Sequence, residues 1–194
     1  VERSRGLGDV YKRQVSAHEV GHTIGLPHNF GSSSAYPVDS IRSKTFTKKF
    51  GIAPSIMDYA RFNYIAQPGD EGVSLVIDVG PYDKYSTMWG YKPILNKTAE
   101  EEKVILNKWI TERADDPMFR FGSSSIDPSS QTEDLGNDAI KASNYGIANL
   151  KRIVPNLIEW TTEDGENYDE LQYLYGQVLS PVSYTHLTLP TIYS

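Results

Sequence analysis

The chain has 194 residues, of which 25 are acidic and 19 are lysine or arginine, so its formal net charge is -6 at pH 7. That balance, without a compensating basic run, argues against a nucleic-acid partner, because phosphate binding needs clustered lysine and arginine. The absence of cysteine excludes a disulfide framework and a thiolate zinc site. No stretch of the sequence reaches the apolar length of a membrane-spanning helix.

The two ends of the chain resemble non-native sequence. Residues 1–14 resemble the translation of a sequencing adapter, and residues 182–194 resemble the reverse-strand reading of its partner adapter. Such tails are excluded from fold prediction. The alternative, natural disordered termini, is disfavoured because the resemblance occurs at both ends. We therefore expect the native part to begin shortly before His18, as a fragment of a longer protein.

A histidine-rich stretch follows the first tail, with the pattern H-E-x-x-H-x-x-G-x-x-H over residues 18–28. Residues four apart lie on the same face of a helix, so His18 and His22 can bind one metal ion. Gly25 permits the chain reversal that can return His28 toward the same ion as a third ligand. Three nitrogen ligands leave one tetrahedral position open, which is typical of catalytic rather than structural Zn2+.

Glu19 lies beside this histidine pair. The sequence predicts that Glu19 is the general base for a zinc-activated water that hydrolyses peptide bonds. An alternative makes the histidines ordinary polar residues of a buried helix, but three at this spacing together with Glu19 favour the metal site. Two other functions stay open: a non-catalytic, zinc-stabilised binding module, and a zinc hydrolase of a non-peptide bond. A purely structural site would not require Glu19.

The histidine pattern is the metzincin signature, and Pro54-Ser55-Ile56-Met57-Asp58-Tyr59 resembles the Met-turn of that clan. The resemblance implies that Met57 forms an apolar floor beneath the three imidazoles and is not a ligand. It also implies that Tyr59 approaches the metal and can bind the oxyanion. For Tyr59 the alternative is ordinary packing, since other tyrosines lie nearby in the sequence.

Further segments resemble the bacterial Met-zincin family, which comprises large zinc metalloproteases of Bacteroidetes-type bacteria related to a toxin's protease subunit. The segments that carry this resemblance are YPVDS at 36–40, ARFNY at 60–64 and GPYDKY at 80–85. The resemblance runs from about Val15 to about Ser180 and is strongest through Trp89. It implies a Zn2+ cofactor, a peptide or protein substrate, and an exported enzyme that is periplasmic, attached to the outer membrane or secreted.

The apolar pattern predicts a mainly α fold, as a fragment of an α+β zincin catalytic domain. An extended segment is expected at 73–79 and irregular connections at 29–36 and 115–133. Thr98 and Glu101 predict a capping box. The expected helices span 15–26, 39–50, 81–91, 98–113, 135–154 and 169–179.

Two clusters of residues within these elements each allow a structural and a functional interpretation. Tyr82, Tyr85 and Trp89 form an aromatic stripe at helical spacing, which is expected to be core rather than a ligand platform. The acidic residues Glu133, Asp134 and Asp138 suggest calcium, but they lack the ordered spacing of a calcium loop. A solvated helix start is therefore the favoured interpretation for them.

The sequence predicts four segments. Residues 15–95 form the C-terminal part of a metzincin catalytic domain, with the zinc motif and the Met-turn, and residues 96–181 form a helical extension. Residues 1–14 and 182–194 are the non-native tails. The strand that binds substrate in metzincins lies upstream of the zinc helix, so this fragment is expected to lack part of its cleft.

Overall fold

The computed structural model describes residues 2–60, 62–123 and 126–179. It is mainly helical, and no strand occurs among those residues, which confirms the predicted fold class. The chain divides into two compact units, residues 1–139 and residues 140–194. None of the described helices is long and apolar enough to cross a membrane.

The first unit contains five α-helices and two short 3-10 helices within its described residues. They are α1 (Glu2–Thr23), η1 (Ser33–Ala35), α2 (Val38–Ile41), α3 (Lys44–Phe50), α4 (Pro81–Tyr91), α5 (Ala99–Thr111) and η2 (Pro117–Phe119).

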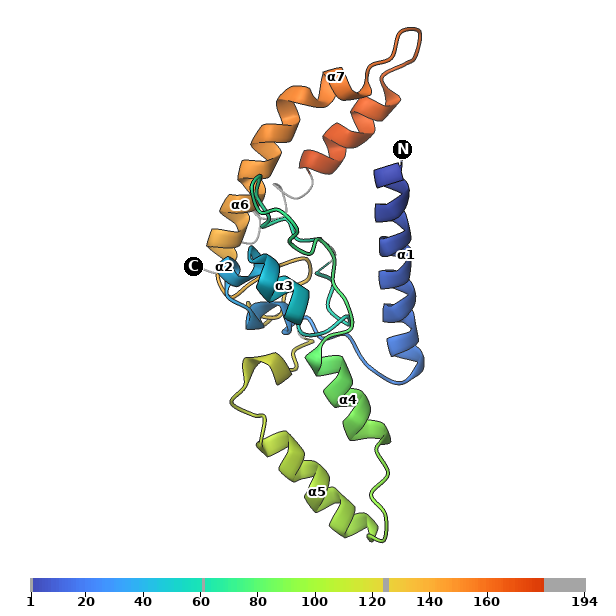
Figure 1. Cartoon of the computed structure of the whole chain (residues 1–194), viewed down its shortest axis with the longest axis vertical. Helices are drawn as coiled ribbons and strands as arrows, with labels where there is room; N and C mark the ends of the chain where they lie inside the picture. Colours follow the sequence, from blue (N-terminus) through green and yellow to red (C-terminus); the bar gives the residue numbers. More distant parts are fainter. Residues whose placement is uncertain (1, 61, 124–125, 180–194) are drawn as a thin grey trace. The chain divides into compact units, whose positions relative to one another are not determined.

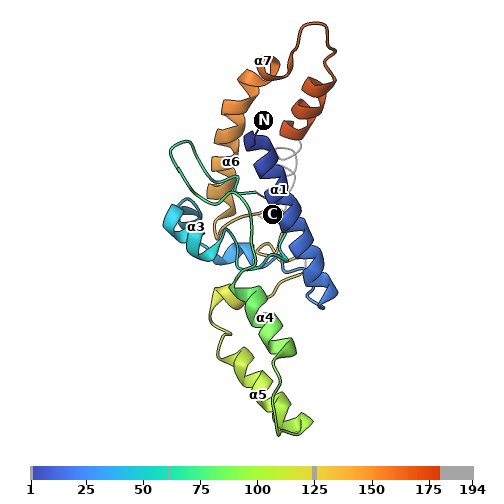
Figure 2. The same ribbon diagram turned by 45° about the vertical axis from the view of Figure 1, so that its right-hand side comes forward.

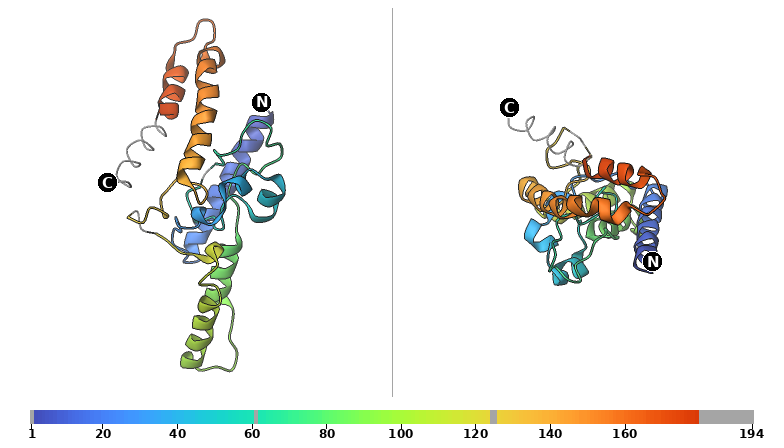
Figure 3. Two further views of the ribbon diagram at one scale, coloured as in Figure 1. Left: turned by 90° about the vertical axis from the view of Figure 1, so that its left-hand side faces the viewer. Right: turned by 90° about the horizontal axis from the view of Figure 1, so that it is seen from above.

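The second unit begins as α6 starts. It contains most of α6 (Ala139–Ile153), followed by η3 (Val154–Asn156) and α7 (Leu157–Thr161), and residues 169–179 are also helical. Pro155 lies just beyond α6, as predicted, because proline cannot donate the backbone hydrogen bond that would continue the helix. A loop after α7 then reverses the chain (Figure 3).

A tight turn ends α1 and returns the chain toward the helix. Gly25 has a φ of 86°, a left-handed conformation that glycine adopts without the steric cost of a side chain. The Gly25 N–H donates to the His22 carbonyl (3.0 Å), and the Leu26 N–H donates to the Gly21 carbonyl (3.0 Å). The predicted reversal after the second histidine is therefore present, and Figure 1 shows the chain turning back at the end of α1.

The core of the first unit surrounds residues 52–65. The largest contributors are almost fully buried apolar side chains: Ile41, Ile52, Ile56, Met57, Ile65 and Leu135. A hydrogen bond joins this segment to the start of α4, where the Tyr82 N–H donates to the Pro54 carbonyl (3.0 Å). The Pro54 carbonyl also lies so close to Gly80 that a Cβ at Gly80 would collide with it. Glycine is therefore required at that position.

The predicted helix at 39–50 is two helices. Ser43 breaks it, because its backbone is extended and its Oγ accepts a hydrogen bond from the Phe46 N–H (3.4 Å) as the N-cap of α3. Phe46 and Phe50 then pack on Tyr36, with ring centroids 5.0 and 6.4 Å away. A local capping preference therefore outweighs the continuous helical pattern.

The extended segment expected at 73–79 is not a strand. Its hydrogen bonds go to another loop and to α3: the Asn63 N–H donates to the Leu75 carbonyl (2.9 Å), and the Ser74 N–H donates to Thr47 Oγ1 in α3 (3.1 Å). A strand needs a partner strand to form a ladder, and the described residues provide none here.

The chain reverses direction between helices α4 and α5, as Figure 1 and Figure 2 show. The capping box of α5 is present, since Thr98 and Glu101 exchange hydrogen bonds between side chain and backbone. The aromatic stripe of α4 is less buried than expected, because Trp89 is 39% exposed. No residue of α5 is buried, so α5 does not form a dry interface over that stripe.

The acidic cluster at 133–138 is not uniformly solvated. Glu133 and Asp138 are exposed, but Asp134 is half-buried, and its Oδ1 accepts a hydrogen bond from Ser33 Oγ (2.9 Å). Burial raises the pKa of Asp134 to about 6. Because α6 begins only at Ala139, Asp134 lies in a connection packed on the loop after His28 rather than at a helix start.

Asp58 is a second buried carboxyl in the same region. It is 2% exposed, and its Oδ2 accepts from the Ser33 N–H (2.8 Å) and from Ser32 Oγ (3.0 Å). Its Oδ1 has no hydrogen-bond partner among the described residues. Burial raises the pKa of Asp58 to about 8, and the nearby Asp134 charge acts in the same direction.

This shift predicts that Asp58 contributes less stability to the metal-free protein as pH rises. An unfolded Asp58 releases its proton near pH 3.8, whereas the folded one holds it to about pH 8, so the folded state binds more protons in between. The stabilisation is complete below the lower value and is lost as pH rises through the upper one. Urea unfolding in EDTA from pH 4 to pH 9 should show that the wild-type protein loses stability relative to Asp58→Asn as pH rises. Equal slopes for both proteins would contradict the prediction.

Candidate metal centre

The three predicted ligands lie together. Ring nitrogens of His18, His22 and His28 all lie within 4.8 Å of one another. Nε2 of His22 and Nε2 of His28 are 3.0 Å apart. His18 is buried and the other two are half-buried. The helical spacing of four residues and the turn at Gly25 thus bring all three imidazoles to one point.

Backbone carbonyls orient two of these rings. Nδ1 of His18 lies 2.7 Å from the Ile56 carbonyl oxygen, and Nδ1 of His22 lies 2.9 Å from the Leu26 carbonyl oxygen. A carbonyl only accepts, so each Nδ1 carries a proton, and in the neutral form of the ring the lone pair lies on Nε2. This is the usual outer hydrogen bond of a metal-binding histidine. The donor set of three imidazole nitrogens therefore fits a divalent ion such as zinc.

The charge state of His28 also suits a ligand. Burial lowers its pKa, and the neighbouring His22 and His18 lower it further, while Glu19 acts in the opposite direction. The neutral imidazole is the form that offers a lone pair to a metal. Glu19 itself is exposed on α1, directly after His18, so its carboxylate is accessible to solvent and to a substrate.

Met57 lies against the helix between the first two histidines. Its side chain is fully buried, and its sulfur is so close to Gly21 that a Cβ at Gly21 would collide with it. The Met57 carbonyl also accepts a hydrogen bond from the Asn29 N–H (3.0 Å). The structure therefore places Met57 next to α1 and ties its backbone to the residue that follows His28.

Tyr59 stands beside the histidines. Its ring centroid is 5.4 Å from that of His18, in a stacked arrangement, and 4.7 Å from that of His28. Phe30, which the sequence analysis did not select, stacks on His28 at 5.2 Å and lies 5.5 Å from Tyr59. Its position two residues after the third histidine is the only local signal that could have identified it.

Asp83 is a further residue that sequence reasoning missed. It is 3% exposed at the start of α4 and accepts hydrogen bonds from Ser55 Oγ (2.6 Å), the Ile56 N–H (2.8 Å) and the Gly80 N–H (2.8 Å). Burial raises its pKa, against the effect of these three donors. Because the Ile56 carbonyl accepts the hydrogen bond from His18 Nδ1, Asp83 stabilises the turn that orients the first histidine.

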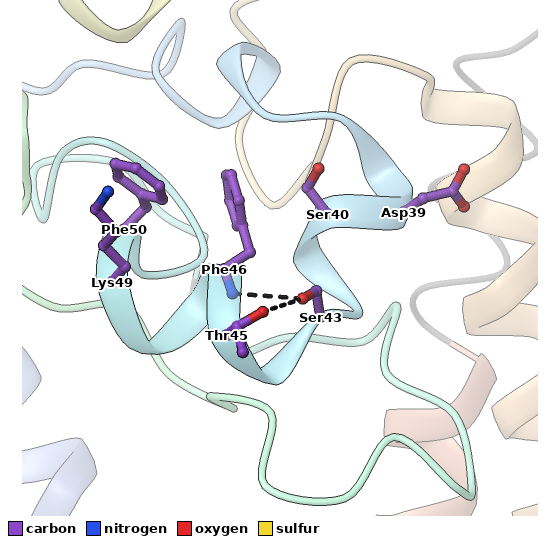
Figure 4. Close-up of a pocket in the computed structure, with 7 residues that line it drawn as sticks. All are labelled: Asp39, Ser40, Ser43, Thr45, Phe46, Lys49 and Phe50. Carbon is purple, nitrogen blue, oxygen red and sulfur yellow. Dashed lines mark hydrogen bonds between the residues drawn. The ribbon is translucent and has the colours of Figure 1, made fainter.

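The hollow between α2 and α3 is a separate feature. Figure 4 shows its lining, in which the Phe46 and Phe50 rings stand near polar side chains and Ser43 Oγ bonds to Thr45 Oγ1 (3.0 Å). None of the three histidines, nor Glu19 or Tyr59, lines it. It therefore contributes no group to the metal centre.

The described residues thus form a mainly helical protein with a candidate metal centre of three histidines beside a buried methionine. A family model described as Met-zincin matches residues 7–189, so the chain belongs to the Met-zincin family. Comparison with curated proteins and with solved structures gave no match. The matched range extends into both terminal segments, and the non-native tails and the boundary at residue 95 stay predictions.

Proposed function

We propose that the protein is a zinc metalloendopeptidase of the metzincin type. The observation that carries the proposal is the convergence of three imidazoles, two of them oriented by backbone carbonyls at Nδ1, which leaves Nε2 as the nitrogen that could bind a metal. Membership of the Met-zincin family supports it. When bound, zinc supplies Lewis acidity toward a carbonyl and toward water.

Each neighbouring residue has one role in this proposal. Glu19 accepts the proton of the attacking water on its exposed carboxylate and delivers it to the leaving amine. Tyr59, whose ring lies beside those of His18 and His28, donates a hydrogen bond from its hydroxyl to the oxyanion of the tetrahedral intermediate. Met57 fills the space beneath the histidines without binding the metal. We also propose, on the family resemblance alone, that the native protein is exported.

Zinc content and casein hydrolysis test this function together. We expect one zinc per chain, lost in His28→Ala, and cleavage of casein that a hydroxamate chelator blocks. The assay should use the 194-residue chain and a second polypeptide that continues with native sequence upstream of Val15, where the substrate-binding strand is expected.

The two competing functions predict a different result. A zinc-stabilised binding module, or a hydrolase of a non-peptide bond, would bind zinc in both polypeptides and cleave no protein substrate at neutral pH. Absence of zinc from both polypeptides would reject the metal centre itself.

A further inference from the structure

Asn29 directly follows the third histidine and is fully buried, at 0% exposure. Its side-chain amide bonds to a segment more than 90 residues away in the sequence. Nδ2 donates to the Arg120 carbonyl (3.0 Å), and Oδ1 accepts from the Gly122 N–H (2.9 Å). Asn29 therefore satisfies a backbone donor and a backbone acceptor of the connection between α5 and α6.

The same two segments approach closely at the neighbouring glycine. The Gly31 N–H donates to the Gly122 carbonyl (2.9 Å). A Cβ at Gly31 would lie 3.1 Å from both N and Cα of Gly122, and a Cβ at Gly122 would collide with Ser130 Oγ. The junction leaves no room for side chains, so its geometry is tightly defined.

Asn29 is also held from the opposite side, where its N–H donates to the Met57 carbonyl (3.0 Å). It thus bridges the Met57 turn and residues 120–122. This matters for His28, because the part of the chain that the structure describes shows no backbone carbonyl bonded to His28 Nδ1, unlike His18 and His22. The position of the third ring depends on how firmly its own backbone is fixed.

We propose that Asn29 is a positioning residue that holds His28 in the metal centre, and that residues 120–122 complete the centre through it. This inference rests on the metal site of the proposed function but not on proteolysis. It assigns a role to the connection after α5, which would otherwise read as a loop without function.

Asn63 provides a matched control. It is also a buried loop asparagine, at 5% exposure, and its Nδ2 donates to the Ile41 carbonyl (3.1 Å) and the Ser74 carbonyl (3.0 Å). Its Oδ1 accepts from the Ala66 N–H (3.3 Å). Like Asn29, it joins two segments, here the end of α2 and the loop at Ser74, but it adjoins no histidine. A loss of stability alone would therefore be similar for Asn29→Ala and Asn63→Ala.

The experiment compares zinc affinity in the full chain by competition with a chromophoric chelator, corrected for the folded fraction from circular dichroism. Asn29→Ala should weaken zinc binding about 10-fold, the lower end for residues that support a metal ligand. It should also change the visible spectrum of the Co2+-loaded protein. Asn63→Ala should keep the wild-type affinity and Co2+ spectrum.

A second variant covers the case in which Asn29→Ala does not fold. Gly31→Ala forces the two segments apart by a few tenths of an ångström without touching Asn29, and it should weaken zinc binding in the same direction. Wild-type zinc affinity and Co2+ spectrum in the folded Asn29 or Gly31 variant would overturn the inference, as would an equal loss in Asn63→Ala. If the wild-type chain itself binds no zinc, the proposed function fails first, so the two failures are distinguishable.

Discussion

The Glu19→Gln variant is expected to bind zinc normally and to lose hydrolysis. Glutamine keeps the size and polarity of the side chain but cannot accept a proton, so kcat/KM should fall by about 10²- to 10⁴-fold, the usual contribution of a general base. Zinc should remain bound because the proposed ligands are His18, His22 and His28, whose ring nitrogens cluster without Glu19. The measurement is casein or peptide hydrolysis together with zinc content in both proteins.

Glu100→Gln is the matched control for charge. Glu100 is an exposed glutamate in the first turn of α5, so the same loss of one negative charge should leave hydrolysis unchanged. If Glu19→Gln retains full activity, Glu19 is not the general base. If it loses zinc as well as activity, Glu19 acts on the metal site itself.

The second large effect is expected on stability, from Asp83→Ala. Its carboxylate receives three hydrogen bonds in a buried site, from Ser55, Ile56 and Gly80. Leaving a buried donor unsatisfied costs about 1–3 kcal/mol, so three such donors should lower the free energy of unfolding by at least about 3 kcal/mol. That is a large part of the 5–15 kcal/mol typical of a whole domain. Urea unfolding of the metal-free protein measures it.

Two further variants separate the hydrogen bonds from the charge. Asp83→Asn keeps an acceptor for the two backbone N–H groups and should lose much less stability than Asp83→Ala. Asp78→Ala, at an exposed aspartate that bonds only its neighbour Val79 (2.7 Å) among the described residues, should stay within about 0.5 kcal/mol of wild type. Equal losses of stability for Asp83→Ala and Asp78→Ala would show that the hydrogen bonds of Asp83 do not stabilise the fold.

Zinc affinity gives a separate test of the hydrogen bonds that Asp83 accepts. Because Ile56 donates its N–H to Asp83 and accepts His18 Nδ1 on its carbonyl, a shift of this turn would move the first ligand. We therefore expect weaker zinc binding in the folded fraction of the Asp83→Ala protein than in that of Asp78→Ala.

The sequence by itself predicted the cluster of three histidines and the mainly helical fold. His18 and His22 lie four residues apart in one helix, and regular helical geometry places such residues on the same face. Gly25 adopts the left-handed φ that its lack of a side chain allows. Local signals likewise located α4 and the capping box of α5. The roles proposed for Met57 and Tyr59 came from the family resemblance, since no spacing rule joins residues so far apart.

Only the tertiary structure decided which polar groups support the centre. Asp83 accepts a hydrogen bond from the turn that precedes Met57. Asp58 is buried against the loop after His28, and Asn29 forms hydrogen bonds with residues 120–122. Each of these side chains reads in the sequence as an ordinary turn or cap residue, because aspartate and asparagine are common there. Their burial and partners depend on which distant loops pack together, and that packing is a property of the whole fold rather than of any local pattern.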